Sequence, residues 1–368
     1  MTADSSQLIA HSLLLVMLKT RNMKKLFIAH WLVLLCWLGS ITFSFGQQLP
    51  YTPFYRHNWV DINPAAFPRE YIEQRDMFLF FNLNARAQRV GVDVGAPRAA
   101  SARTEWVFGS EQYASDHKVG IGLSLDEAGA IKKTAVKMSY AWMGALGENQ
   151  FFSLGGSVDY NNQHIQTDLV NWQTPVSFQD NQLNSNYFSF NMGGFLYHGI
   201  ASGKEGGAFH HSVEHSRLES SYLLEGLSVS QVLSLGNTQN IKRVMQWNFI
   251  LAAVLNEWEL SSWTRYVAGV SYETFGFSLP VSVDLNLRYV FKFRDSPSIA
   301  GDQFWVGSGV NTAATCNFEV GYRRWVNTDL HFARYLQIGF AYTGLRLSSG
   351  AVLQPNDWQV NVGFNLAK

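Results

Sequence analysis

Apolar and polar residues alternate strictly along several segments of the chain, each about ten residues long. In the segment 281–293, the residues on one side are Val281, Val283, Leu285, Leu287, Tyr289, Phe291 and Phe293. The opposite side carries Ser282, Asp284, Asn286, Arg288 and Lys292. A period of two puts alternate side chains on opposite faces of a strand. A tilted strand of about ten residues crosses a bilayer core, with its apolar face toward lipid and its polar face toward a wet lumen.

The same alternation predicts fourteen strands in the chain. They are 77–87, 100–109, 118–126, 132–143, 151–161, 186–198, 221–233, 244–255, 258–267, 280–293, 303–311, 315–325, 335–346 and 357–366. The ninth and eleventh show the pattern only weakly, so twelve strands remain an alternative. The predicted fold is therefore an all-β, transmembrane antiparallel β-barrel over residues 76–368.

An even number of strands puts both ends of a barrel on the periplasmic side. The connections 88–99 and 162–185 then face outward, and Asn256-Glu257 forms a tight periplasmic turn. The connection 199–220 is long for a side where turns are usually short. Residues 47–75 precede the barrel and contain Pro50, Pro53, Pro64 and Pro68, which favour irregular structure. We predict that they form a periplasmic N-terminal segment.

Residues 1–46 are typical of a leader rather than of the folded domain. Met23-Lys24-Lys25 is a basic start, Leu26 to Phe43 is apolar, and small residues precede Gln47. We interpret residues 1–46 as an upstream extension plus a signal peptide that is removed on Sec-dependent export. The alternative is a single N-terminal membrane anchor, because the apolar run is near the lower limit for a spanning helix.

Removal of the leader changes the charge and the cysteine count. It subtracts four basic residues and one acidic residue from the 28 of each, which leaves a net charge of −3. Nothing in this balance favours a nucleic-acid partner, which requires a clustered basic surface. Cys36 is lost with the leader, so Cys316 has no partner for a disulfide within the chain. It alternates with Phe318 and Val320, and we predict that it faces lipid.

Few residues in the chain suggest catalysis or metal binding. His211-Ser-Val-Glu214-His215 matches the H-x-x-E-H spacing of some zinc proteases, but no amphipathic helix surrounds it, and a polar loop is the favoured interpretation. We therefore predict no catalytic residue, no cofactor and no metal, and hence no enzyme. The predicted lumen carries mixed charges, which favour a plugged or tightly packed interior over a selective channel. These lumen residues are Asn82, Asn84, Arg86, Lys137, Asp284, Arg288, Glu319 and Arg323.

Several short words in the sequence resemble a known family. Asp61-Ile-Asn63-Pro64-Ala65-Ala66 follows the predicted mature start, and Arg86-Ala-Gln-Arg-Val-Gly91-Val-Asp93-Val-Gly95-Ala96-Pro97-Arg98 lies further along. Val119 to Gly129, Ser139-Tyr-Ala141 and Gly226-Leu-Ser-Val229 complete the series. In this order they resemble the PorP/SprF family of Bacteroidetes outer-membrane proteins. The positions that match the family motifs are Asn63, Pro64, Gly91, Asp93, Gly95, Ala96, Pro97, Asp126 and Gly129.

The resemblance implies a non-enzymatic role in the type IX secretion and gliding machinery of the outer membrane. Members of the family help to export large surface adhesins or to attach them to the cell. The implied partners are outer-membrane lipid, the C-terminal domain of a secreted adhesin, and the ring and lipoprotein components in the periplasm. A passive porin or hydrophobic-ligand transporter is the competing function.

Overall fold

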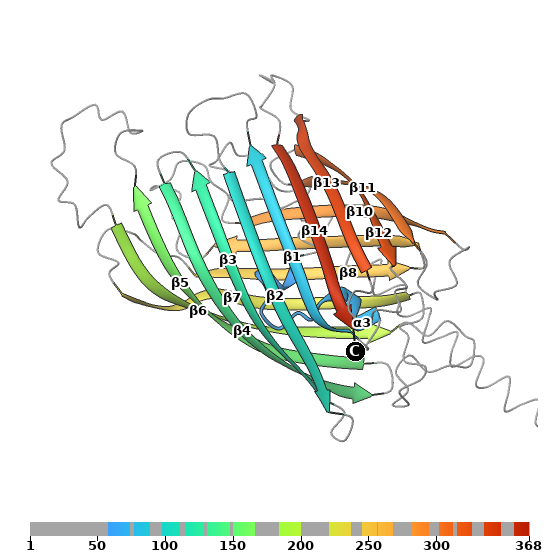
Figure 1. Ribbon diagram of the computed structural model, residues 1–368, viewed down its shortest axis with the longest axis horizontal. Coiled ribbons are helices and arrows are strands. Elements are labelled where there is room, and N and C mark those ends of the chain that lie inside the picture. The colour runs from blue at the N-terminus through green and yellow to red at the C-terminus, as the bar shows by residue number, and fades with distance from the viewer. Residues whose placement is uncertain are drawn as a thin grey trace, which may run out of the picture. The chain divides into compact units, whose positions relative to one another are not determined.

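The computed structural model forms a closed barrel of fourteen antiparallel strands (Figure 1). It describes residues 58–73, 77–88, 98–110, 115–128, 131–147, 150–165, 184–199, 221–236, 245–255, 257–267, 281–293, 302–311, 315–325, 335–346 and 357–367. The predicted leader and most of the predicted connections lie outside these residues. Within them, no helix is long and apolar enough to span a membrane.

The predicted count of fourteen strands is confirmed, and the alternative of twelve is wrong. The strands are β1 (Met77–Gln88), β2 (Arg98–Ser110), β3 (Ser115–Ala128), β4 (Ile131–Gly147), β5 (Gln150–Ile165), β6 (Asn184–Gly199), β7 (Ser221–Gly236), β8 (Gln246–Leu255), β9 (Trp258–Val267), β10 (Val281–Lys292), β11 (Gln303–Asn311), β12 (Thr315–Trp325), β13 (Tyr335–Arg346) and β14 (Asp357–Ala367). Two short helices, α2 (Trp59–Ile62) and α3 (Arg69–Glu73), precede β1.

Each strand pairs with its neighbours in sequence, and β1 pairs with β14 to close the barrel. Met77 opposite Ala367 places the start of the first strand and the end of the last at one rim, which we call the proximal rim. We call the opposite end the distal rim. Leu255 pairs with Trp258, so the predicted tight connection between these two strands is confirmed. Strands β2 to β7 are longer than predicted, because backbone pairing continues beyond the apolar band that the sequence pattern marks.

The two faces of the barrel wall have opposite chemistry. In β4, Met138 and Tyr140 point outward and are exposed, whereas Ser139 and Ala141 point inward and are buried. Outward aromatic residues include Trp247, Trp258 and Trp358. The apolar side chains are thus exposed on the outside of the wall, as a lipid-facing surface requires, and the predicted orientation of the strands is confirmed.

The depth of an outward-facing residue in the wall should determine how much a charged substitution destabilises the barrel in lipid. Ile121 lies at the middle of β3 and is 53% exposed on the outer face, whereas Leu146, which is 57% exposed, lies next to the end of β4. We expect Ile121→Arg to lower the free energy of unfolding by about 2–4 kcal/mol, and Leu146→Arg by about 0–1 kcal/mol, because the cost of a cation depends on its depth in the bilayer. Urea unfolding in phospholipid vesicles measures both values. Equal losses would contradict this placement of the wall.

Candidate functional site: a plug in the barrel lumen

Residues 58–73 lie inside the barrel, against the inner face of its wall (Figure 1). We call this segment the plug. It belongs to residues 47–75, which we predicted to form a periplasmic N-terminal segment. Its apolar side chains instead pack against inward-facing residues of the wall, so the described part of that segment is a component of the lumen.

The backbone of the plug is held by polar side chains of the wall. The carbonyl oxygen of Asp61 accepts a hydrogen bond from Lys137 Nζ (2.9 Å), and that of Ile62 accepts one from Ser228 Oγ (2.8 Å). Ser153 Oγ donates to the carbonyl of Ala65 (2.7 Å). A buried backbone group without a partner is costly, so these donors are what allow an irregular segment to lie in the barrel interior.

Two further wall residues bind the plug next to Ala65. Lys118 donates to the carbonyl oxygen of Ala66, and the hydroxyl of Tyr197 accepts a hydrogen bond from the Phe67 amide (2.8 Å). The Lys118 side chain is fully buried, and its ammonium lies 3.4 Å from Glu105 Oε1. A buried ammonium requires such a partner. Here the charge pair of the wall also positions a donor for the plug.

Asn63 is a plug residue whose side chain binds the backbone of the wall. Its side-chain amide donates to the carbonyl oxygens of Gly194 (3.0 Å) and Leu227 (3.3 Å), which are opposite each other on β6 and β7. Its Oδ1 accepts from the Ala65 amide (3.0 Å) and so fixes the turn that follows. Asn63 is thus bound to two adjacent strands and to its own chain at the same time.

Three inward-facing glycines make room for this contact. Gly155 and Gly193 are opposite each other on β5 and β6, and Gly226 lies on β7. A Cβ added at Gly155 would lie 2.7 Å from the Ala65 Cα, and one at Gly193 would collide with Asn63 Oδ1. A Cβ at Gly226 would lie 3.1 Å from Asn63 Nδ2. We call these three residues the glycine patch, because their lack of side chains permits the close approach of another backbone.

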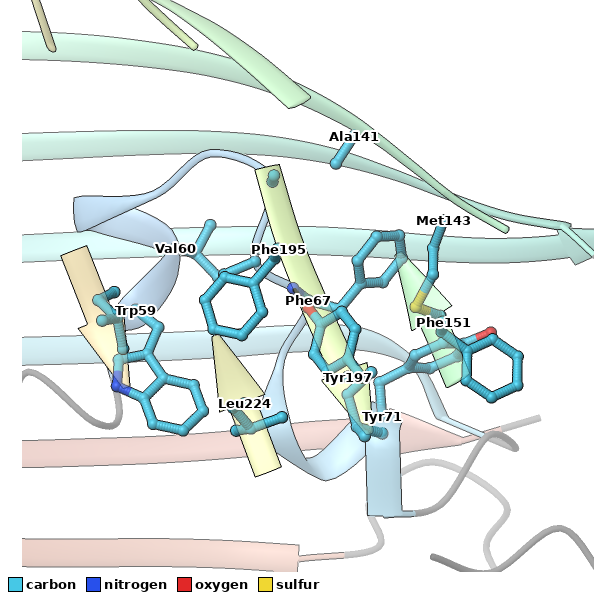
Figure 2. Close-up of a cluster of buried hydrophobic side chains, with 14 of the residues drawn as sticks. Trp59, Val60, Phe67, Tyr71, Ala141, Met143, Phe151, Phe195, Tyr197 and Leu224 are labelled. Carbon is cyan, nitrogen blue, oxygen red and sulfur yellow. Dashed lines mark hydrogen bonds between the residues drawn. The ribbon is translucent and has the colours of Figure 1, made fainter. Parts of the chain in front are cut away.

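A cluster of buried apolar side chains packs between the plug and the wall (Figure 2). Trp59 lies against Phe195, with ring centroids 6.0 Å apart, and Phe67 packs with Tyr71 at 5.8 Å. The wall side of the cluster includes Ala141, Met143, Phe151, Phe195, Tyr197, Tyr222, Leu224, Ile250 and Trp263. Burial of aromatic rings is a large favourable term, so the plug is bound by apolar packing as well as by hydrogen bonds.

Ion pairs join the plug to the wall at both of its helices. In α2, Asp61 Oδ1 lies 3.1 Å from Arg103 Nη1. At α3, Arg69 pairs with Glu259, which is fully buried and also pairs with Arg288 of β10. Breaking a buried pair by removing one partner leaves an uncompensated charge. Glu259 therefore couples the plug to two strands of the wall.

The predicted lumen residues face the interior, and many are paired across strands. Arg86 pairs with Asp357 at 2.6 Å, and Arg323 donates to Gln337 Oε1 at 2.7 Å. Asn361 and Gln359 donate to the first strand, at Asn82 Oδ1 and Asn84 Oδ1. The prediction that mixed charges of the lumen pair across strands is confirmed for Arg86 and Arg288, while Lys137 binds the plug backbone instead.

The structure describes three of the nine family-motif positions. Asn63 and Pro64 are plug residues, and Asp126 lies on β3 opposite Lys133 of β4. Gly91, Asp93, Gly95, Ala96, Pro97 and Gly129 lie outside the described residues, as does the H-x-x-E-H stretch at 211–215. No cluster of three or more His, Cys, Asp or Glu side chains suited to a metal ion occurs in the described part of the chain.

Comparison with known proteins decides the family. A family model described as type IX secretion system membrane protein PorP/SprF matches residues 44–360. The chain belongs to the PorP/SprF family. The resemblance drawn from the sequence is thereby confirmed, and family and fold together place this PorP/SprF protein in the outer membrane. A search of curated protein sequences gives no match.

Solved structures with a similar fold include two forms of a channel protein. The toluene transporter TodX from Pseudomonas putida is 10% identical, with a TM-score of 0.50, and the match covers 89% of this chain and 96% of that one. A deltaS2S3 mutant of TodX, described as a monoaromatic hydrocarbon channel, is 9% identical with a TM-score of 0.51, over 84% and 94% of the two chains. At these identities the likeness concerns the fold alone.

We predict that side chains introduced into the glycine patch release the plug from the wall. Gly155→Val together with Gly193→Val should push Asn63 and Ala65 off the wall and raise the single-channel conductance in planar bilayers several-fold above that of the wild type. The matched control is Gly156→Val with Gly194→Val, since a Cβ at these outward glycines meets its nearest neighbours at 3.5 and 3.6 Å. If the patch variant is folded and conducts no more than the control, the plug does not limit the pore.

Proposed function

We propose that this PorP/SprF protein is a non-enzymatic scaffold of the type IX secretion and gliding machinery. On its outer side it binds secreted adhesin-type cargo through the C-terminal domain of that cargo. On its periplasmic side it contacts ring and lipoprotein components of the machinery. Sec-dependent export and removal of residues 1–46 precede its insertion into the outer membrane.

The plug is the observation that carries this proposal. Its carbonyl groups, its Asn63 side chain and its charged residues are bound to strands β2 to β7 and to β9. A lumen filled in this way supports a rigid platform for other proteins better than it supports free diffusion of solutes. Family membership supplies the machinery in which such a platform acts.

We assign cargo binding and contact with the periplasmic ring to different connections between the strands. Cargo binding is assigned to the connections 88–99 and 162–185, which join strands at the distal rim. Because residues 58–73 lie in the lumen, contact with the periplasmic ring is assigned to residues 47–57 and to the connection between β6 and β7. This connection joins the two strands whose carbonyl groups bind Asn63.

A passive porin or hydrophobic-ligand transporter is the competing function. It is suggested by the similar fold of the TodX structures, which are described as a toluene transporter and a monoaromatic hydrocarbon channel. It requires substantial conductance or solute uptake by the wild-type protein. The plugged scaffold requires a low conductance that increases only when the plug is released.

Deletion of residues 200–220 tests the scaffold directly. We expect a cell that carries this deletion to insert the barrel into its outer membrane normally but to lose most export of its adhesin cargo, because the proposed contact with the ring is removed. Immunoblots of cell-surface and periplasmic fractions measure the export. Shortening of residues 326–334, a connection at the same rim, serves as the control. Normal export by the 200–220 deletion would remove the docking role from this connection.

A further inference from the structure

A polar cavity of about 160 Å³ lies directly beside the plug, on its distal side. Its floor is formed by the plug residues Asp61, Ile62 and Pro64. Its walls are polar side chains from four adjacent strands: Lys133 and Lys137 of β4, Asp159 of β5, Ser189 and Asn191 of β6, and Ser230 and Gln231 of β7. A volume of this size corresponds to about five water molecules.

The acidic groups of the cavity already have partners. Asp61 forms an ion pair with Arg103 at 3.1 Å. Asp159 Oδ2 accepts a hydrogen bond from Asn191 Nδ2 (2.9 Å), and its Oδ1 accepts a longer one from Ser157 Oγ (3.4 Å). Both carboxylates are therefore already engaged by groups of the protein, and Asp61 faces the guanidinium of Arg103 as its counter-charge.

The basic groups of the cavity still have donors to offer. An ammonium group carries three N–H donors. Lys137 uses one of them on the Asp61 carbonyl, and within the described residues Lys133 makes no hydrogen bond, although Asp126 lies opposite it on β3. Both ammonium groups of the cavity thus keep N–H donors that no hydrogen bond among the described residues uses, and cationic donors bind a carboxylate strongly.

A bulge in β7, with an unusual backbone conformation, lies beside the cavity. Between Phe190 and Met192 the register of β6 with β7 shifts, and the bulge contains Gln231 with φ of 59°. Asn191 holds this bulge, since its Oδ1 accepts from the Gln231 amide (2.9 Å) while its Nδ2 donates to Ser157 and Asp159. A non-glycine residue in the left-handed region is unfavourable and is common at functional sites. Here Gln231 itself lines the cavity.

The position of the plug limits what can enter. A polypeptide that reaches the cavity from the distal rim meets Asp61, Ile62 and Pro64 and cannot continue past them, so the cavity suits the end of a chain better than a chain that passes through. We infer that the cavity binds the C-terminal carboxylate of an extended polypeptide, with Lys133 and Lys137 as its cationic ligands. That this polypeptide is secreted cargo rests on the proposed function, whereas the chemistry of the cavity does not.

Calorimetric titration of the full mature protein in lipid nanodiscs tests the inference. The probes are tri-alanine with a free carboxylate, the same peptide as its C-terminal amide, and acetate. The free acid should bind at least about tenfold more tightly than the amide, because the amide cannot form the ion pairs. It should also bind more tightly than acetate, which lacks the peptide groups that Gln231 and Ser230 of the cavity can contact.

Single substitutions assign the site. Lys133→Gln and Lys137→Gln should each weaken the binding of the free acid at least about tenfold. Lys133→Gln is the more informative of the two, because Lys133 has no hydrogen bond to the plug. Lys132→Gln is the matched control, since Lys132 is the exposed neighbour on the outer face of the same strand. Asp159→Asn should strengthen binding, because it removes a negative charge beside the carboxylate.

Each outcome decides the inference. It is overturned if the free acid does not bind, if the amide or acetate binds equally well, or if Lys133→Gln and Lys132→Gln behave alike. Peptide binding without any defect in cargo export by Lys133→Gln would support the cavity and contradict its use for cargo. If the purified wild-type protein binds no peptide, but deletion of its gene abolishes cargo export, the proposed function stands and this binding site is removed.

Discussion

The inner wall of the barrel hydrogen-bonds the backbone of the plug, and the architecture of the lumen depends on this interaction. An irregular segment inside a barrel exposes peptide groups that water no longer satisfies. Lys137, Ser228, Ser153 and Lys118 supply donors to four plug carbonyl groups, and the Tyr197 hydroxyl accepts from an amide. The glycine patch lets Asn63 reach the carbonyl groups of the wall itself. Apolar packing and ion pairs then further stabilise the plug, whose backbone groups are already hydrogen-bonded.

Alternation along the sequence predicted the barrel, fourteen strands with twelve as the alternative, and the outward face of the strongly alternating strands. It worked because lipid on one side and polar groups on the other impose a period of two. It did not predict the longer strands from β2 to β7, since pairing beyond the bilayer needs no apolar face. The tight connection between Leu255 and Trp258 was predictable because apolar alternation resumes immediately after two polar residues.

The plug could not be predicted in the same way. Its prolines favoured an irregular periplasmic segment, and its hydrogen-bond and ion-pair partners in the wall are 42 to 190 residues away in the sequence. One signal was present, because the words Asn63-Pro64-Ala65 and Gly226-Leu-Ser-Val229 both matched the family, and the structure brings them into contact through Leu227 and Ser228. The wall glycines Gly155 and Gly193 gave a weaker signal, since a glycine in a strand often marks the close approach of another backbone.

The plugged barrel links the two sides of the proposed scaffold. The plug is the floor of the distal cavity and is bound through Arg69 to Glu259 near the proximal rim. A ligand that contacts Asp61 therefore touches the same short segment that ends beside the first strand. This arrangement gives the two sides of the protein one shared element, whereas an open pore would leave them connected only through the wall.

Labelling of a cysteine placed in the plug tests the central claim most directly. In a Cys316→Ala background, Ala65→Cys should not react with a membrane-impermeant maleimide until the barrel is unfolded, because Ala65 is fully buried against the wall. Asp61→Cys, which lines the cavity, should react in the folded protein. Rapid labelling of Ala65→Cys in the folded barrel would contradict a docked plug.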